Sequence, residues 1–241
     1  MKVISYSIMQ RLEKQHWWFR VRHELIIQLF RKYFSRRTDL KILDIGCGMG
    51  SVSALLSRWG TVYSVDPSAE AIKFCRQKGL QHLYQNTAES LPFNDGFFDV
   101  VIALDVLEHV KDDQQAVDEI SRVLKPQGVF ICFVPAFMFL WSEQDEILMH
   151  YRRYNRSSLS SLFTDDWKYL KTSYFNFFLF PFIFSVRLLK KLLRLKQKKD
   201  EVEQISFLNP LFYWIFKREI FFLSRWRFPF GVSLLAVYKK N

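Results

Sequence analysis

The first chemically suggestive residues of this 241-residue chain are three glycines in the stretch "LDIGCGMGS" (43–51), just after Asp44. They are Gly46, Gly48 and Gly50. Glycines at a strand-to-helix turn let the backbone approach a ligand closely and expose amide N–H groups. Because Ser51 stands where a dinucleotide-binding fingerprint requires glycine, the pattern is an acid followed by G-x-G-x-G. Asp66, 20 residues beyond Gly46, stands where a carboxylate accepts both hydroxyls of a ribose. A glycine-rich turn without a ligand is the alternative interpretation.

A second group of acids and imidazoles follows a later apolar run. The stretch "DVLEHV" presents Asp105, Glu108 and His109 at i, i+3 and i+4, so that their side chains point the same way on a helical turn. Two carboxylates with an imidazole can hold a divalent ion such as Mg²⁺ or Mn²⁺, and His150 is a further candidate ligand. The alternative is a histidine that only packs or caps the turn.

The stretch "WSEQDEILMHYRRYN" (141–155) is the third candidate region. If this stretch borders a ligand site, His150 acts as a base or as a metal ligand for the acceptor substrate. Tyr151 and Arg152 would then shape the acceptor site or bind the acceptor. His109 is the other candidate acid–base residue. The alternative is an ion-paired surface loop, in which acidic side chains neutralise nearby arginines. The acids would be Glu143, Asp145 and Glu146, and the arginines Arg152, Arg153 and Arg156.

Alternating strands and helices must position these residues. Apolar runs predict strands at 40–46, 60–66, 80–86, 97–105, 128–135, 166–176 and 231–241. Helical patterns lie between them and over 8–34, with a break around His16. This alternation predicts a doubly wound α/β sheet in which ligands lie beyond the carboxyl ends of the strands. The stretches 43–51, 105–110 and 141–155 should therefore meet at one edge.

Four consecutive motifs, "ILDIGCGMG", "VYSVD", "NTAESLPFNDGFFDVVIALDVLEHV" and "ISRVLKPQGVFICFVP", resemble those of class I S-adenosylmethionine-dependent methyltransferases. They cover residues 41–135. The resemblance implies a Rossmann-like, seven-stranded sheet of order 3-2-1-4-5-7-6 with an antiparallel seventh strand. It also implies that the three glycines line the methionine and ribose part of S-adenosylmethionine, that Asp44 lies near its amino group, and that Asp66 holds the ribose.

The resemblance extends to the adenine and to the acceptor chemistry. Thr87 stands where the family usually has an aspartate that reaches the adenine amine, so Ala88 and Glu89 share that assignment, and Leu104 is a further cofactor-binding candidate. The turn "DVLEHV" resembles the metal-binding turn of ubiquinone-type O-methyltransferases and of small-RNA 2′-O-methyltransferases. The stretches "HWWFRVRHEL" and "YFNFFLFP" resemble a bacterial group linked with cell-envelope glycan and polyprenyl-lipid pathways, in which the N-terminal helix is a lid.

The charge of the chain is concentrated near its end. The net charge is +11, and residues 168–241 account for all of it, with 15 Lys and Arg against 4 Asp and Glu, together with 13 of the 25 Phe. A basic, aromatic segment favours an anionic membrane surface over nucleic acid, because its apolar side chains exceed what base stacking needs. A basic amphipathic helix is predicted over 186–199. The apolar run 177–186 is ten residues long and contains Pro181, so it is too short to span a bilayer.

These features predict a single methyltransferase domain over 1–241. Residues 1–37 would form lid helices, 38–176 and 230–241 the Rossmann-like core, and 177–229 an amphipathic helical insertion at the membrane interface. The absence of a signal-like N-terminus and of paired cysteine spacing favours a cytoplasmic protein, peripheral on the membrane, with free thiols. The predicted function is O-methylation of a lipid-linked, glycan or quinone-like acceptor. The alternatives are a metal-dependent RNA 2′-O-methyltransferase, a soluble small-molecule methyltransferase with a dimer interface on the insertion, or a non-catalytic cofactor-binding protein.

Overall fold

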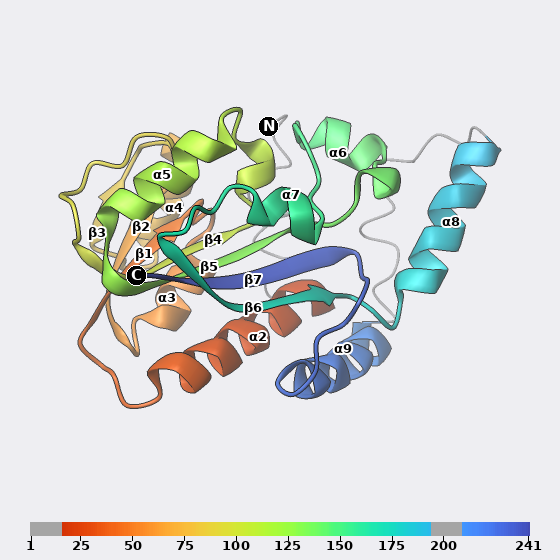
Figure 1. Ribbon diagram of the computed structural model, residues 1–241, viewed down its shortest axis with the longest axis horizontal. Coiled ribbons are helices and arrows are strands. Elements are labelled where there is room, and N and C mark those ends of the chain that lie inside the picture. Colours follow the sequence, from red (N-terminus) through yellow and green to blue (C-terminus); the bar gives the residue numbers. More distant parts are fainter. Residues whose placement is uncertain (1–15, 194–208) are drawn as a thin grey trace.

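A seven-stranded mixed sheet forms the centre of the protein, in a computed structural model that describes residues 16–193 and 209–241 (Figure 1). The strand order is β3-β2-β1-β4-β5-β7-β6, and β7 runs antiparallel to both β5 and β6. The predicted α/β fold and its strand order are confirmed. The strands are β1 (Leu40–Ile45), β2 (Gly60–Val65), β3 (His82–Tyr84), β4 (Phe98–Leu104), β5 (Leu124–Pro135), β6 (Trp167–Phe175) and β7 (Ser233–Lys240).

Helices cover both faces of the sheet (Figure 1). On one face lie α2 (Trp17–Phe34), α3 (Ser51–Leu56) and α9 (Asn209–Leu223), and on the other lie α5 (Asp113–Val123) and α7 (Arg156–Ser160). The helix α4 (Ala69–Gln77) joins β2 to β3. The central strands are buried on both faces, as parallel strands covered by helices must be, and their side chains form one continuous core.

The N-terminal helix begins where the sequence pattern predicted a break. The His16 side chain accepts a hydrogen bond from the Trp18 backbone N–H at 3.3 Å and so caps α2. The predicted helical residues before His16 lie outside the described part of the chain. The pattern did not indicate two short helical turns in the region of the predicted loop at 141–155. The turn η2 (Met138–Leu140) precedes the loop, and α6 (Glu143–Ile147) lies within it. They resemble η1 (Leu107–His109) in being too short to show a helical period.

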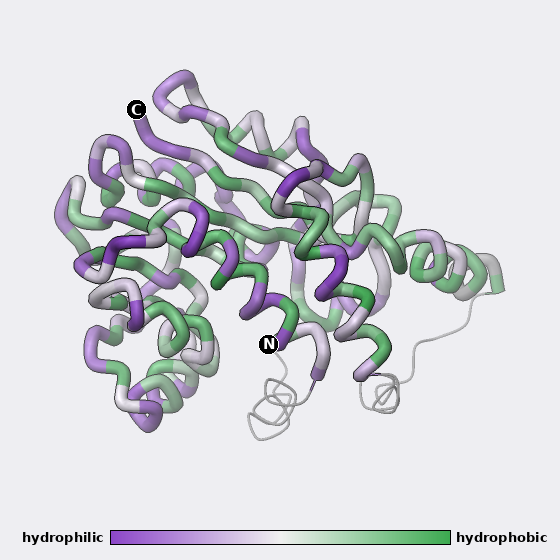
Figure 2. Tube along the Cα trace, turned by 90° about the horizontal axis from the view of Figure 1, so that it is seen from below, coloured by the Kyte–Doolittle hydropathy of each residue, from purple (hydrophilic) through white to green (hydrophobic). Residues whose placement is uncertain are grey.

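The insertion before β7 contains two described helices, and the predicted start of the first was wrong. The helix α8 (Phe180–Leu192) begins inside the apolar run, because Pro181 lies in its first turn, where its missing N–H costs no hydrogen bond. Hydrophobic residues predominate along α8, which projects at one end of the molecule (Figure 2). Most of the cationic half of the predicted helix, from Arg194 onward, lies outside the described residues. No described helix has the length and apolar character needed to cross a bilayer.

Two buried charges attach α9 to the sheet. The Glu219 carboxylate, fully buried, accepts backbone N–H bonds from Phe177 at 3.0 and 3.1 Å, and burial raises the pKa of this carboxyl to about 7. Lys171 of β6 donates to the backbone carbonyl of Leu223, at the carboxyl end of α9 where a cation is favourable. Trp17 of α2 stacks on Phe216 of α9, with ring centroids 4.4 Å apart. The inner stripe of α9 therefore belongs to the core.

Candidate active site

The glycine loop follows β1 and has room for a ligand at one position. Gly46, Gly48 and Gly50 have φ values of +69°, +52° and +73°, a region that favours glycine. A Cβ on Gly46 would come within 2.5 Å of Val106, and one on Gly50 within 2.8 Å of the Cys75 sulfur. A Cβ on Gly48 would meet nothing within 4 Å. The outer two glycines are thus required by close packing, while Gly48 faces open space that a ligand can enter.

Asp66 pins the same loop from the end of β2. Its two carboxylate oxygens accept the backbone N–H groups of Gly48 and Ser68, each at 2.9 Å. Burial raises the pKa of Asp66, and these two hydrogen bonds oppose the increase. Each carboxylate oxygen retains a further lone pair that could accept a ribose hydroxyl, and that contact stays a prediction.

Asp44 lies beneath the loop and is 2% exposed. It accepts a hydrogen bond from the Ser53 hydroxyl of α3 at 2.5 Å, and Ser53 in turn accepts one from Ser64 of β2 at 2.9 Å. Burial raises the pKa of Asp44 to about 7, although the Ser53 bond opposes the increase. In the structure Asp44 joins β1, α3 and β2, and its contact with a ligand amino group stays a prediction.

The remaining cofactor candidates lie along the same carboxyl edge. Thr87 is exposed, Ala88 is buried and Glu89 is half-buried in the turn after β3, while Leu104 ends β4 and is buried. The side-chain amide of Gln115 on α5 donates to the Glu89 carbonyl at 3.2 Å. This turn is therefore held by the helix that follows β4, and no described contact decides between the three candidates for the adenine.

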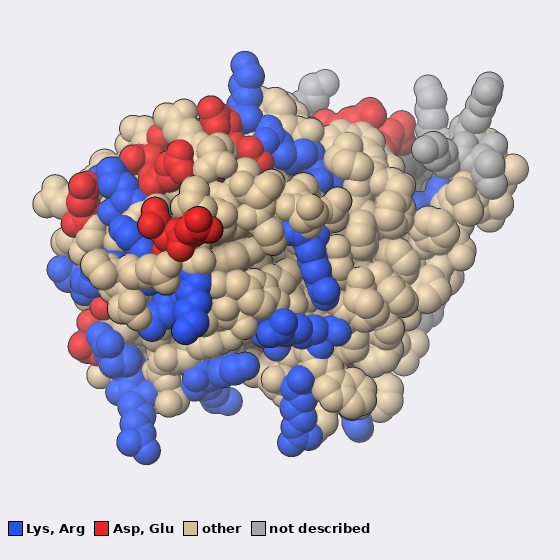
Figure 3. Space-filling view, viewed as in Figure 1, with Lys and Arg blue, Asp and Glu red and all other residues tan. Residues whose placement is uncertain are grey.

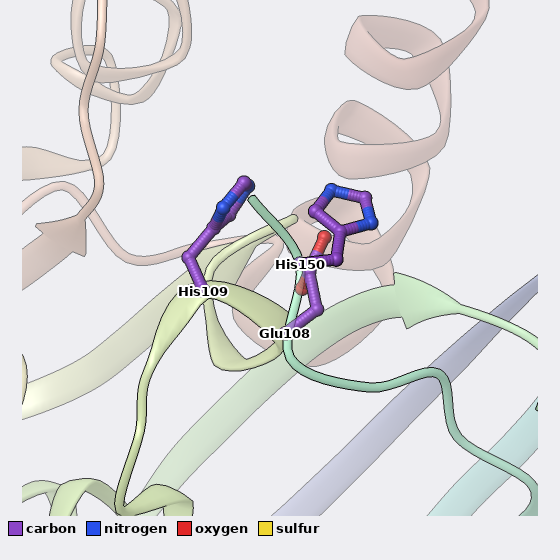
Figure 4. Close-up of side chains that lie close together, drawn as sticks. All are labelled: Glu108, His109 and His150. Atoms are coloured by element: carbon purple, nitrogen blue, oxygen red, sulfur yellow. The ribbon is translucent and has the colours of Figure 1, made fainter. Parts of the chain in front are cut away.

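Three of the four predicted metal-ligand candidates come together beyond β4. Glu108, His109 and His150 each offer one ligand atom, and these atoms lie within 4.8 Å of one another (Figure 4). The two imidazoles meet edge to face, with ring centroids 4.6 Å apart. Desolvation, followed by the nearby His150, lowers the pKa of His109 to about 4, which keeps this imidazole neutral and able to bind an ion or accept a proton.

The Glu108 carboxylate lacks a partner for one of its oxygens. The side chain is 1% exposed, and Oε2 has no hydrogen-bond partner among the described residues. Burial, followed by the charge of Asp105, raises the pKa of Glu108 well above its usual value. A buried carboxylate in this condition requires a proton or a cation. Since two ligand atoms about 2.1 Å from an ion are at most about 4.2 Å apart, the cluster would contract slightly around a metal.

Asp145 orients His150, a role that the sequence pattern did not reveal. The Asp145 carboxylate faces the His150 Nδ1 at 2.8 Å and accepts bonds from the Arg153 guanidinium at 2.7 and 3.0 Å. Burial alone would raise the pKa of Asp145, but the bonds from His150 and Arg153 outweigh it and hold that pKa well below its usual value. With Nδ1 engaged by the carboxylate, Nε2 of His150 remains available to a ligand.

Backbone contacts fix the segment that carries His150. The Tyr151 N–H donates to the Glu108 carbonyl at 2.8 Å, and the Tyr154 N–H donates to the Pro135 carbonyl at 2.9 Å. The buried Tyr154 hydroxyl also donates to Asp113 at 2.7 Å. Residues 150–154 are thus tied both to η1 and to the end of β5, which explains why His150 faces His109.

The other candidates have different partners. Asp105 forms an ion pair at 2.5 Å with Arg22 of α2 and is not one of the three residues whose ligand atoms come together. Arg152 pairs with Asp113, and the Tyr151 side chain is 56% exposed. Of the ion pairs in the alternative loop interpretation, the structure records Asp145–Arg153, whereas Arg152 has the different partner just named.

Sequence reasoning missed Asp145, Arg153 and Arg22 as site residues. The spacing of Asp145 and His150 gave no helical signal, because His150 lies beyond the end of α6, and the two residues are brought together by the His150 N–H, which donates to the Asp145 carbonyl at 2.9 Å. Arg22 gave no local signal, since it lies 83 residues from Asp105. On the same helix, His23 Nε2 lies 3.3 Å from the Ser51 hydroxyl at the start of α3. The beginning of α2 thus borders the glycine loop, and its action as a lid stays a prediction.

Comparisons with known proteins agree with this arrangement. Residues 43–132 match the family described as "Methyltransferase domain". The "Ubiquinone biosynthesis O-methyltransferase" of Rickettsia typhi is 32% identical over 151 residues, which cover 54% of this chain and 61% of that protein. The uncharacterized methyltransferase YcgJ of Bacillus subtilis is 35% identical over 102 residues, covering 39% of this chain and 40% of that protein. The chain spans between 60% and 64% of the length of the ubiquinone relatives from three Rickettsia species.

Solved structures share the whole fold. The structure of YcgJ from Bacillus subtilis superposes with a TM-score of 0.59 at 20% identity, covering 91% of this chain and 98% of that one. The N-methyltransferase NodS from Bradyrhizobium japonicum WM9, in complex with S-adenosyl-L-homocysteine, superposes with a TM-score of 0.58 at 16% identity, covering 96% and 91%. At these identities the likeness concerns the fold alone.

Proposed function

We propose that the protein transfers the methyl group of S-adenosylmethionine to a hydroxyl oxygen. The premise is that residues 43–132 match a methyltransferase domain, which we take to be of the S-adenosylmethionine-dependent, class I type. The observation that carries the proposal is the pairing of His150 with Asp145 beside His109 and the unpartnered Glu108 oxygen. This cluster lies next to the glycine loop, because Val106, two residues before Glu108, packs against Gly46.

The glycine loop and Asp66 support S-adenosylmethionine as the methyl donor. Gly48 leaves open space beside the carboxylate of Asp66, which suits a ribose, and the NodS complex places the demethylated cofactor in a related fold. The sulfonium already carries a good leaving group, so the protein must mainly align the acceptor oxygen with the methyl group and exclude water. Methyl transfer to a hydroxyl releases a proton, which requires a base.

In this proposal His150 takes that proton. Its Nδ1 faces Asp145, which fixes the ring and stabilises the imidazolium that forms when Nε2 accepts a proton. Arg153 holds the Asp145 carboxylate from the other side. Asp145 and Arg153 thus act as positioning residues, because Asp145 contacts His150 and Arg153 contacts Asp145.

Glu108, His109 and His150 also fit a divalent ion. Carboxylate and imidazole ligands suit Mn²⁺, Zn²⁺ or Mg²⁺, and the unpartnered Glu108 oxygen is the observation that favours one. When bound, such an ion would lower the pKa of the acceptor hydroxyl. In that case Asp145 would orient His150 as a ligand, as carboxylates commonly do for metal-bound histidines.

The acceptor class rests on the relatives. The Rickettsia relatives are named for O-methylation in ubiquinone biosynthesis, which favours a quinone-like or lipid-linked acceptor. The resemblance of "HWWFRVRHEL" to an envelope-linked bacterial group supports lipid-linked glycans as well. We propose that such an acceptor lies over the His109 and His150 rings, beside the exposed side chain of Tyr151.

Calorimetry and a transfer assay test the proposal separately. The protein should bind S-adenosylhomocysteine, and with S-adenosylmethionine it should methylate a phenolic quinone precursor. Activity that disappears with a chelator and returns with Mn²⁺ or Mg²⁺ would support the metal, and full activity in chelator would leave His150 as a metal-free base. Failure to bind either form of the cofactor would overturn the proposed function.

A further inference from the structure

The outer face of α9 exposes large apolar side chains that no described part of the chain covers. Trp214 is 56% exposed, Phe221 53% and Leu211 51%, and Trp226 just after the helix is 63% exposed. Side chains of this size normally lie inside a protein or at an interface. We call this surface, made by Leu211, Trp214, Lys217, Arg218, Phe221, Arg225, Trp226 and Arg227, the α9 outer face.

The exposed charges on this face are all cationic. Lys217, Arg218, Arg225 and Arg227 are exposed, with the Arg218 guanidinium 4.9 Å from the Trp214 ring centroid and that of Arg225 5.2 Å from the Phe221 centroid. The acid of this helix, Glu219, is fully buried on the opposite side. In Figure 3, Lys and Arg gather along the lower edge, where α2 and α9 lie, while most visible Asp and Glu lie on the upper part.

The helix is held in place independently of this face. Phe216 and Glu219 point inward, where they contact Trp17 and the backbone of Phe177, and the carboxyl end accepts a bond from Lys171. Because these contacts use only the inner stripe, the outer face can be changed without removing what attaches α9 to the sheet.

We propose that the α9 outer face is the surface by which the protein docks on an anionic lipid bilayer. Tryptophan and phenylalanine settle at the depth of lipid headgroups, and neighbouring lysine and arginine pair with lipid phosphates. Trp214, Lys217, Arg218 and Phe221 line a shallow, open depression, so both kinds of contact are available to one headgroup. A second shallow depression is lined by aromatic side chains, including Trp226, beside Arg227, and offers apolar contacts to a lipid chain.

Charge complementarity distinguishes the bilayer from other occupants. In a two-fold contact between copies of this chain, cationic faces would meet without acids to neutralise them. Nucleic acid would satisfy the cations, but Leu211 has no base-stacking use and would remain exposed to water. An anionic bilayer satisfies the cations and the apolar side chains together. The inference concerns the partner of the proposed enzyme, but it does not depend on the acceptor, because docking needs no methyl transfer.

Co-sedimentation with lipid vesicles tests the inference on the full-length protein. Vesicles of phosphatidylglycerol mixed with phosphatidylcholine should bind the protein. Vesicles of phosphatidylcholine alone should bind at least about tenfold less protein, because the electrostatic attraction between each cation and the anionic surface is then missing. The double substitution Lys217→Glu/Arg218→Glu should weaken vesicle binding by at least about tenfold. The double substitution Trp214→Ala/Phe221→Ala should weaken vesicle binding at both low and high salt, because salt screens charges but not apolar contacts.

The matched control is Lys73→Glu/Arg76→Glu on the exposed face of α4, which makes the same change of charge elsewhere. It should retain at least half of the binding. All variants should bind S-adenosylhomocysteine as the unsubstituted protein does, which separates this test from that of the proposed function. Equal loss of binding in the α4 control would overturn the assignment of the α9 outer face. Binding to RNA without binding to vesicles would overturn it too. So would a dimer that the Trp214→Ala/Phe221→Ala variant breaks.

Discussion

The cofactor half and the acceptor half of the carboxyl edge are constructed in different ways. The glycine loop and Asp66 lie within 23 consecutive residues, 44–66, and are joined largely by backbone N–H groups. The acceptor half combines residues from distant stretches. Glu108 and His150 approach each other, and Arg22 of α2 pairs with Asp105; these contacts are made by side chains, with one backbone bond between Tyr151 and Glu108. A local, backbone-built site can be recognised in a sequence, whereas a site assembled by side chains depends on the whole fold.

The two halves also differ in how their charges are balanced. In the cofactor half, burial raises the pKa of Asp44, and the hydrogen bond from the Ser53 hydroxyl opposes this increase only in part. In the acceptor half, Asp145 has a guanidinium and an imidazole as partners, and its pKa is lowered. Substitutions in the two halves should therefore have different consequences.

The largest expected effect comes from removing the imidazole of the acceptor half. His150→Ala should lower the rate of methyl transfer by roughly 100- to 10,000-fold, because a positioned base contributes that much. Its affinity for S-adenosylhomocysteine by calorimetry should stay within about twofold. His82→Ala, at the amino end of β3, is the matched control and should retain most activity. Equal losses in both variants would remove the distinction between the halves.

Removing the carboxylate of the cofactor half should give the converse result. Asp66→Ala should weaken S-adenosylhomocysteine binding by roughly 100-fold or more, because hydrogen bonds to a charged group are lost and the Gly48 N–H is released. The control Glu70→Ala, exposed on α4, should leave the dissociation constant unchanged. A variant at Asp66 that binds normally but turns over slowly would contradict the assignment.

Two adjacent arginines test how the acceptor half is held together. Arg153→Ala should lower the free energy of unfolding by about 3 kcal/mol or more, because it leaves the buried Asp145 carboxylate without its main partner. Arg152→Ala removes a more exposed pair with Asp113 and should cost less than about 1 kcal/mol. Urea unfolding measures both values. If Arg152→Ala lowered both the stability and the rate of methyl transfer more than Arg153→Ala does, the prediction from the sequence that Arg152 is a site residue would be favoured.

The pH dependence of stability should have opposite signs for Asp44 of the cofactor half and Asp145 of the acceptor half. The raised pKa of Asp44, about 7 against 3.8, gives a contribution that is present below about pH 4 and lost as the pH rises to about 7. The lowered pKa of Asp145 gives a contribution that is present above about pH 4 and lost as the pH falls below that value.

Urea unfolding across this range, with Asp44→Asn and Asp145→Asn, measures both contributions. The stability of Asp44→Asn relative to the unsubstituted protein should rise with pH by up to about 1.4 kcal/mol per unit. That of Asp145→Asn should be poorest at neutral pH and recover in acid. Parallel slopes in the two variants would contradict the difference in charge balance.

The insertion shows most clearly where prediction from the sequence ended. The amphipathic insertion over 177–229 was expected to lie at a membrane interface, but α9 uses its inner stripe, including Phe216 and Glu219, to pack on α2 and on the backbone that follows β6. Composition cannot show which stripe of a helix is occupied, because inner and outer aromatic residues look alike. The buried Glu219 also lies within a basic segment, where its inward role gives no local signal.

The sequence by itself determined the alternation of strands and helices and the glycine loop with Asp66, because apolar periods and a glycine-rich turn are local properties of consecutive residues. The order of the strands followed from the resemblance of its motifs to a known family, and the structure has that order. Only the tertiary structure decided that Asp145 and Arg153 orient His150, and that Asp105 pairs with Arg22. Those choices depend on which buried charges meet after the chain has folded. An acid such as Asp105 forms its bond with whichever cation the packing of distant helices brings within reach.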